Sequence, residues 1–327
     1  MRRRYQVILN ENAGVCAQIP ELEQRIRAGL GPDAKVQVVR SRTPEEAIRA
    51  AAHARRCELD AVIAVGGDGT HHWLVDALAG GETPLALIPL GTANDLAANY
   101  GIPRDLEQAC AVIKEGARTR IDLVEVEKKC FATAGGMGLA TDVALGVCAL
   151  RRRSRIFHWL MRRVGGWIYP LYMLFTVLLS RRIGYRWGVE EADGTRREVD
   201  GYMALCMNQA FLGKNFRAVP DASNKDGAFD LLLVKRQPRF SRLRLLGALS
   251  ASLRGTHIGR RDVEVVRARR LVLTTPRPLP FFADGELVAE TDRLEFSLRP
   301  RALPLIVPAA HGEAEPSPTA RARRRAA

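Results

Sequence analysis

The segment AVIAVGGDGTHHWLVDAL, residues 61–78, decides the fold. It opens with a continuous apolar run, which is typical of a buried strand in a parallel sheet. The glycine-rich run GGDGT follows, and a helix-like pattern comes after it. Open α/β sheets bind ligands at the carboxyl ends of their strands, beside helix N-termini. The segment therefore predicts a strand, a ligand-binding turn and a helix.

Strand-like and helix-like segments alternate over the first 125 residues. Such alternation with apolar strands predicts a mostly parallel sheet that is covered by helices on both faces. The predicted strands are residues 5–9, 35–40, 61–65 and 84–90, and the predicted helices are residues 20–30, 44–56, 72–79 and 106–114.

The pattern changes after Ile121, where short β-like runs separated by turn residues dominate. This pattern predicts an antiparallel sandwich or barrel, interrupted by helical insertions at residues 142–180 and 240–253. We therefore divide the chain into an α/β nucleotide-binding domain (1–122), a β-sandwich substrate domain (123–310) and a disordered tail (311–327) that is rich in Pro, Ala and Arg.

Composition limits the classes of partner. Apolar residues make up 47 % of the 327 residues and the net charge is +14. The charge indicates an anionic partner, either a phosphorylated ligand or an anionic membrane, although many arginines can simply be solvated. No aromatic-basic recognition motif accompanies it, so nucleic acid is not expected as a partner.

The cysteines and the chain start indicate a compartment. Six scattered cysteines without a CxxC pair argue against a zinc site or a disulfide scaffold and suit a reducing environment. The apolar run near residue 5 is too short for a signal peptide, so a cytoplasmic location is the expectation.

One strongly apolar stretch, Ile168–Leu179, is shorter than the roughly 20 residues of a membrane-spanning helix. Arginines crowd both sides of it. It reads either as a buried helix or as an interfacial segment whose arginines lie near lipid headgroups.

The GGDGT turn suits phosphate. Gly66, Gly67 and Gly69 carry no Cβ, so backbone N–H groups can approach a phosphate closely, and the helix dipole favours negative charge there. Asp68 makes sense beside a phosphate if Mg²⁺ lies between them. Thr70 can bond a phosphate oxygen. The alternative is a tight turn in which Thr70 caps the helix.

Two further turns carry similar chemistry. Pro89 to Leu96 (PLGTANDL) also follows an apolar strand and opens a helix, with Asp95 able to cap that helix or hold an amide. The third turn, Asn10 to Gly14, follows the first strand. Three such turns should lie along one edge of the sheet.

These motifs resemble the diacylglycerol-kinase catalytic family, which includes bacterial lipid kinases and relatives of sphingosine and ceramide kinases. The resemblance rests on GGDGT, PLGTANDLA, KDGAFDLLLV and FFADGELV, and covers residues 4–308. It implies a Rossmann-like lobe similar to NAD kinases and phosphofructokinases, a C-terminal antiparallel β-sandwich, and ATP bound between the two.

The resemblance also implies roles for single residues. Glu286 would accept the proton of the lipid hydroxyl, with Asp284 and Asp68 completing the catalytic group. A structural Mg²⁺ would be held by Ser223, Asp226 and the carbonyl of Ala228. The residues expected to contact ATP are Asn10, Gly14, Ser41, Gly66, Gly67, Asp68, Gly69, Thr70, Thr92, Asn94 and Asp95.

Two of these assignments have simpler alternatives. Asp284-Gly285 is also a hairpin signature, with Glu286 then merely solvated. The Asn-Lys-Asp-Gly run at residues 224–227 can equally be a surface turn.

The chain departs from the family pattern at two places. His71, His72 and Trp73 stand where a hydrophobic residue, Asn and Glu are common, and Ala140 stands where an aspartate is common, with Asp142 two residues later.

The leading hypothesis is an ATP- and Mg²⁺-dependent lipid kinase that acts on diacylglycerol or a sphingoid or ceramide-type lipid and contacts anionic membranes peripherally. The alternatives are an NAD kinase-like enzyme and a non-catalytic nucleotide- or lipid-binding relative. The oligomeric state stays open, with a homodimer as one option.

Overall fold

A computed structural model describes most of the chain in eight segments. These are residues 3–11, 19–57, 59–91, 93–153, 168–179, 184–213, 216–236 and 241–312. The predicted ATP contacts Gly14 and Thr92 lie outside the described residues, as does the predicted tail (311–327) except for His311 and Gly312.

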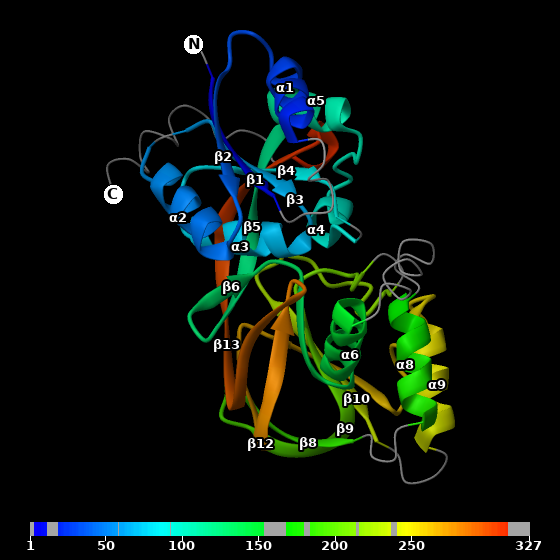
Figure 1. Ribbon diagram of the computed structural model, residues 1–327. Coiled ribbons are helices and arrows are strands. Elements are labelled where there is room, and N and C mark those ends of the chain that lie inside the picture. The colour runs from blue at the N-terminus through cyan, green and yellow to red at the C-terminus, as the bar shows by residue number, and fades with distance from the viewer. Residues whose placement is uncertain are drawn as a thin grey trace.

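Strands and helices alternate through the upper lobe of Figure 1. In chain order they are β1 (Arg4–Asn10), α1 (Ile19–Leu30), β2 (Lys35–Ser41), α2 (Pro44–Ala54), β3 (Ala61–Gly66), α3 (Asp68–Leu78), β4 (Leu85–Pro89), α4 (Asp95–Asn99) and α5 (Leu106–Glu115).

The four strands of this lobe are parallel and ordered β4-β3-β1-β2. Strand β3 is fully buried because both faces are covered. Its Val62 and Ala64 pack with α2 and α3, whereas its Ala61, Ile63 and Val65 pack with α1 and α5. The predicted two-sided burial of a parallel sheet is confirmed.

The lower lobe is built mainly from antiparallel strands (Figure 1). Its elements are β5 (Ala117–Val126), β6 (Lys129–Phe131), β7 (Ala134–Gly138), α6 (Leu139–Arg153), α8 (Ile168–Leu179), β8 (Tyr185–Glu191), β9 (Arg196–Met207), β10 (Phe229–Lys235), α9 (Ser241–Ser252), β11 (Val263–Ala268), β12 (Arg270–Ala283) and β13 (Glu286–Val307), followed by the 3₁₀ turn η3 (Ala309–His311).

The two lobes share one sheet. Strand β13 runs through 22 residues and pairs with β12 at its start and with β5 further on. At its end Leu305 pairs in parallel with Leu85 of β4, which joins the lower strands to the upper sheet. The predicted boundary at residue 122 falls inside β5, so the division into 1–122 and 123–310 stays a prediction.

Two apolar cores fill the lower lobe. One lies among the strands and contains Trp187, Phe229, Phe281 and Phe296. The other lies under α6, α8 and α9, which stack on the outer side of this lobe (Figure 1). The α/β lobe followed by a β-sandwich-like lobe confirms the predicted fold class.

The starts of two helices refine the expectation. Helix α3 begins at Asp68 and not at His72, because Gly67 is already its N-cap. The second glycine turn opens a helix as predicted, the short α4, whose N-cap is Asn94 and not Asp95. Among the described helices, none is long and apolar enough to cross a membrane.

Candidate active site

The two glycine turns lie directly against each other. They follow the adjacent strands β3 and β4, where Gly66 pairs with Pro89. A Cβ built on Gly91 would lie 2.5 Å from the Cα of Gly67 and 2.6 Å from Oδ1 of Asn94. Only glycine permits this approach, so both turns present bare backbone at the start of α3.

Asp68 ties these turns together. Its Oδ2 accepts the backbone N–H of Asn94 at 2.8 Å, and its Oδ1 accepts that of Asp95 at 2.6 Å. Asn94 adopts the left-handed conformation (φ 56°), and its side chain bonds both the N–H and the carbonyl of Gly91. Asp68 and Asn94 therefore set the shape of the backbone in both glycine turns.

The first turn reaches the same place. Nδ2 of Asn10, at the end of β1, donates to Oγ1 of Thr70 at 2.9 Å. Thr70 makes no capping bond, since α3 has no side-chain cap. Ser41 is fully buried and its hydroxyl donates to the carbonyl of Leu9 at 3.3 Å. Asn10 and Thr70 thus lie at the candidate site, whereas the Ser41 hydroxyl is directed to backbone.

A tight hairpin carries the predicted catalytic acids. Ala283 and Glu286 pair across the turn, and the two residues between them, Asp284 and Gly285, have φ of 48° and 88°. Positive φ at both positions is the signature of a type I′ turn, which favours Asp-Gly. The alternative interpretation of Asp284-Gly285 as a hairpin turn is therefore confirmed for the local backbone.

Asp284 is buried, unlike an ordinary hairpin residue. Its carboxylate accepts the backbone N–H groups of Ala132 (3.0 Å) and Thr133 (2.9 Å) and the Thr133 hydroxyl. Burial acts to raise the pKa of Asp284, but these donors together with His72 outweigh it and the pKa lies below its usual value. Asp284 is an ionised anchor for the turn.

Glu286 follows directly after the turn that Asp284 anchors. A Cβ added to Gly69 would collide with Oε1 of Glu286, so the carboxylate rests on the GGDGT turn of the opposite lobe. In Figure 1 the tip of the β12–β13 hairpin points up toward α3 and ends below it. The fold thus brings Glu286 to the GGDGT turn, whose Gly69 is 217 residues away in sequence (286 − 69).

The two histidines that depart from the family pattern have opposite surroundings. His72 is buried with Nδ1 3.3 Å from Oδ2 of Asp284. Both ring nitrogens of His71 are buried and make no hydrogen bond within the described part of the chain. Burial lowers the pKa of His71 to about 4, although Asp68 and Asp284 oppose the shift.

Several contacts between the lobes were not predicted. Oδ2 of Asp95 accepts the N–H of Gly213 at 2.7 Å, which confirms that Asp95 holds an amide. The Tyr100 hydroxyl donates to Asn224 at 2.6 Å, and Asp76 accepts the N–H of Cys130 at 2.7 Å. These partners are far apart in sequence, and no motif predicted that they meet.

The residues predicted to hold a structural Mg²⁺ make other contacts. Asp226 pairs with Arg267 at 2.8 Å and accepts the N–H of Ala228 at 3.2 Å. Ser223 is half-buried in the same turn. Among the described residues, no group of three or more His, Cys, Asp or Glu side chains is arranged to hold a metal.

Asp142 also contacts a residue outside the predicted site. It is on α6 and accepts a hydrogen bond from the hydroxyl of Tyr185 on β8. This contact directs the Asp142 carboxylate toward β8.

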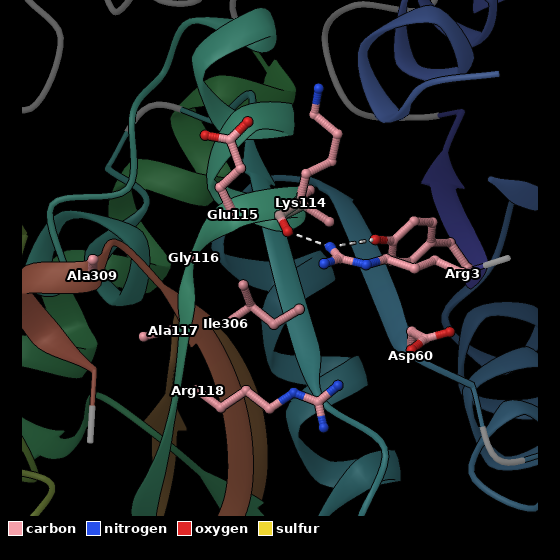
Figure 2. A pocket seen from close by; sticks show the side chains of 11 residues that line it. Arg3, Asp60, Lys114, Glu115, Gly116, Ala117, Arg118, Ile306 and Ala309 are labelled. Atoms are coloured by element: carbon pink, nitrogen blue, oxygen red, sulfur yellow. Dashed lines mark hydrogen bonds between the residues drawn. The ribbon is translucent and has the colours of Figure 1, made fainter. Parts of the chain in front are cut away.

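A separate hollow of about 490 Å³ lies in the upper lobe. Figure 2 shows it between the start of β1 and the end of α5, with Arg3 reaching from one wall to the carbonyl of Lys114 on the other. This is the amino end of β1, opposite to Asn10. The hollow is therefore distinct from the candidate active site.

Comparison with known proteins agrees with this geometry. The model of the diacylglycerol kinase catalytic domain matches residues 4–126, and that of the YegS C-terminal NAD kinase beta sandwich-like domain matches residues 144–307. A diacylglycerol kinase of Mycobacterium tuberculosis (strain ATCC 25618 / H37Rv) is 30 % identical over 259 residues, which span 76 % of this chain and 77 % of the relative. The chain belongs to the diacylglycerol kinase family.

Other members of the diacylglycerol kinase family extend the comparison. A diacylglycerol kinase of Bacillus subtilis (strain 168) is 28 % identical over 245 residues, or 74 % of this chain and 76 % of the relative. A crystal structure of a diacylglycerol kinase from Bacillus anthracis shares the fold with a TM-score of 0.67 and 17 % identity, covering 94 % of this chain and 98 % of that one. The protein is a lipid kinase, a phosphotransferase.

Proposed function

We propose that this lipid kinase transfers the γ-phosphoryl group of ATP to a hydroxyl of a diacylglycerol or of a sphingoid or ceramide-type lipid. The observation that carries the proposal is the position of the Glu286 carboxylate on Gly69, where the substrate-side lobe meets the glycine turns. Phosphoryl transfer needs both reactants held in line, and two facing lobes supply that arrangement.

The upper lobe binds the triphosphate in this proposal. The backbone of Gly67 and Gly91 and the N-terminus of α3 face the phosphates, so amide dipoles stabilise their negative charge. Asp68 acts mainly by holding the amides of Asn94 and Asp95 in place. Asn10 and Thr70 add neutral hydrogen-bonding groups beside them. For Gly14, Ser41 and Thr92, contact with ATP rests on the family resemblance alone.

In this proposal Glu286 accepts the proton of the lipid hydroxyl. As the lipid hydroxyl oxygen forms its bond to phosphorus, the bond from phosphorus to the ADP oxygen breaks, and the hydroxyl proton passes to the Glu286 carboxylate. Asp284 does not touch the reacting atoms, since its oxygens already accept three donors from Ala132 and Thr133. It fixes the turn that carries Glu286.

Magnesium belongs to the proposal at the nucleotide and not at the predicted second-lobe site. With ATP bound, Mg²⁺ would neutralise phosphate charge beside Asp68, whose oxygens keep a lone pair after accepting one N–H each. At Ser223, Asp226 and Ala228 the arranged residues do not fit a cation, because the Arg267 guanidinium occupies the Asp226 carboxylate. A second-lobe site requires that this ion pair opens.

Helix α8 would bring the site to its substrate. Its side chains that are exposed by 42–63 % are Tyr169, Leu171, Leu174, Phe175, Leu178 and Leu179. Exposed Arg242 and Arg244 lie on the neighbouring α9, and Arg242 donates to the carbonyl of Leu178. An apolar face beside cations suits peripheral contact with an anionic membrane.

The flanking arginines at 155, 162, 163, 181 and 182 lie outside the described residues. A cytoplasmic, membrane-associated location belongs to the same proposal.

Incubation of the purified chain with labelled ATP, Mg²⁺ and a total lipid extract tests the proposed function. We expect label in a lipid product that chromatography and mass spectrometry identify as a phosphomonoester. A parallel reaction with NAD as the acceptor should stay unlabelled. A chain that binds ATP yet labels no lipid would be a non-catalytic relative, and label in NAD alone would favour the NAD kinase alternative.

A further inference from the structure

A histidine of helix α3 contacts the acidic turn of the lower lobe. Nδ1 of His72 lies 3.3 Å from Oδ2 of Asp284, and both residues are buried. The donors to the Asp284 carboxylate from Ala132 and Thr133 belong to the lower lobe itself. His72 is therefore the link from Asp284 to the lobe that carries the glycine turns.

The surroundings of His72 favour its charged form. The acidic groups that act on it are Asp284 and Glu286 from the facing turn and Asp76 from its own helix. Burial acts to lower the pKa of His72, but the hydrogen bond and charge of Asp284 and the charges of Asp76 and Glu286 outweigh it. The pKa of His72 lies above its usual value, in contrast to that of the adjacent His71.

The position of Glu286 depends on the same turn. Asp284 and Glu286 are separated only by Gly285, whose φ of 88° suits a tight reversal. With Asp284 fixed on the α3 side, Glu286 falls on Gly69 of the first turn of α3. His72 is one helical turn further along that helix, so the two contacts clamp the hairpin tip at two points on α3.

We propose that His72 is a positioning residue for Glu286: as an imidazolium it holds the Asp284 carboxylate to α3 and so keeps the Glu286 carboxylate on the GGDGT turn. This inference rests on the proposed function of Glu286 as proton acceptor. It adds a charged interaction between the lobes, which a neutral side chain at this position would not supply.

The proposal fixes the sign of a pH effect. A histidine whose pKa is raised in the folded chain stabilises its contact fully below the unfolded pKa, and the stabilisation is lost as pH rises through the folded pKa. Turnover should therefore decline on the alkaline side when His72 loses its proton. Replacement of His72 by Asn keeps a donor but removes the charge, and should remove this alkaline step.

Nuclear magnetic resonance of the full chain with labelled histidines tests the pair without any kinase assay. We expect His72 to titrate above the ordinary value, and Asp284→Asn to lower its midpoint by about one pH unit or more. His257, whose Nε2 contacts the Ala218 carbonyl, serves as an internal control and should not move. A His72 midpoint that Asp284→Asn leaves unchanged would overturn the proposal.

Steady-state kinetics of His72→Asn and His72→Gln give the second arm. Loss of positioning should lower kcat by about 10-fold or more and leave the KM for ATP near that of the wild type. A fall in stability alone would not remove the alkaline limb of the pH profile. Unchanged kcat and an unchanged profile in both variants would contradict the positioning role. If the wild type transfers no phosphate to lipid, the proposed function fails. The titration would still show whether His72 and Asp284 form an ion pair.

Discussion

The carboxylate of Glu286 and the α-carbon of Gly69 lie in contact across the junction of the two lobes. Glu286 begins β13, which is also the strand that joins the lower sheet to β4. Glu286, the proposed proton acceptor, is thus attached to the same continuous sheet as the glycine turns. This connection explains how residues at opposite ends of the chain meet with fixed geometry.

Gly69→Ala tests the contact from the opposite side. The added methyl would meet the far end of the Glu286 side chain, which can move, so we expect the fold to tolerate it. Displacement of the carboxylate should lower kcat by about 100-fold, because small misplacements of a catalytic group cost about that much. Kinetics and thermal unfolding of the variant measure both effects.

Gly247→Ala on α9 is the matched control, since a Cβ there meets nothing closer than Nη2 of Arg260 at 3.6 Å. This variant should keep full turnover. Normal turnover in Gly69→Ala would instead mean that the Glu286 carboxylate does not act from its position on the turn.

Gly91→Ala should damage nucleotide binding. Its Cβ would meet backbone, 2.5 Å from the Cα of Gly67, so the two turns must separate. We expect a loss of about 1–3 kcal/mol in the free energy of unfolding and a Kd for ATP raised at least about 10-fold. Calorimetric titration with ATP measures the latter, and unaltered affinity would exclude these turns as the phosphate site.

His71 should make the fold acid-sensitive. Its folded pKa of about 4 lies below the ordinary histidine pKa of 6.5, so as the pH falls the unfolded chain takes up a proton before the folded chain does. Between about pH 7.5 and pH 5 the free energy of unfolding of the wild type should therefore fall by about 2 kcal/mol. The His71→Val variant should not show this loss. Urea unfolding at both pH values measures the difference.

The exposed His53 on α2 provides the comparison for that experiment. His53→Val should leave the pH dependence of unfolding as it is in the wild type. Equal pH dependence in His71→Val and the wild type would mean that His71 is not held neutral in the fold.

Helix α8 should mediate binding to lipid. Leu171, Phe175 and Leu179 recur every fourth residue on its exposed face. Their joint replacement by Ser should weaken sedimentation with anionic vesicles by about 10-fold or more, because each apolar side chain contributes about 1.5–3 kcal/mol on full burial. Activity on a water-soluble short-chain diacylglycerol should persist. The exposed Ile48→Ser on α2 is the control, and undiminished vesicle binding by the triple variant would remove this role from α8.

Local sequence predicted the strands, the glycine turns and the Asp-Gly hairpin because short-range patterns govern them. Burial on both sides explains the apolar run of β3, and positive φ at Asp284 and Gly285 explains that dipeptide. The family resemblance named Glu286 for the site, and the fold brings it to Gly69.

Contacts over long sequence distances could not be predicted in this way. The local sequence pattern does not indicate that the Asp68 carboxylate accepts the amides of Asn94 and Asp95. It also does not indicate that His72 contacts Asp284. The odd pair His71-His72 was a visible departure from the family, but only the packing of α3 reveals that one ring is neutral and the other faces an acid.

The most direct test of the central claim compares Glu286→Gln with the wild type in two measurements on the same preparation, phosphoryl transfer from labelled ATP to diacylglycerol vesicles and calorimetric ATP affinity. The amide keeps the size of the side chain but accepts no proton. We predict that transfer falls by at least about 100-fold with the Kd for ATP nearly unchanged. Transfer close to the wild-type rate would show that another group takes the proton and would contradict the account.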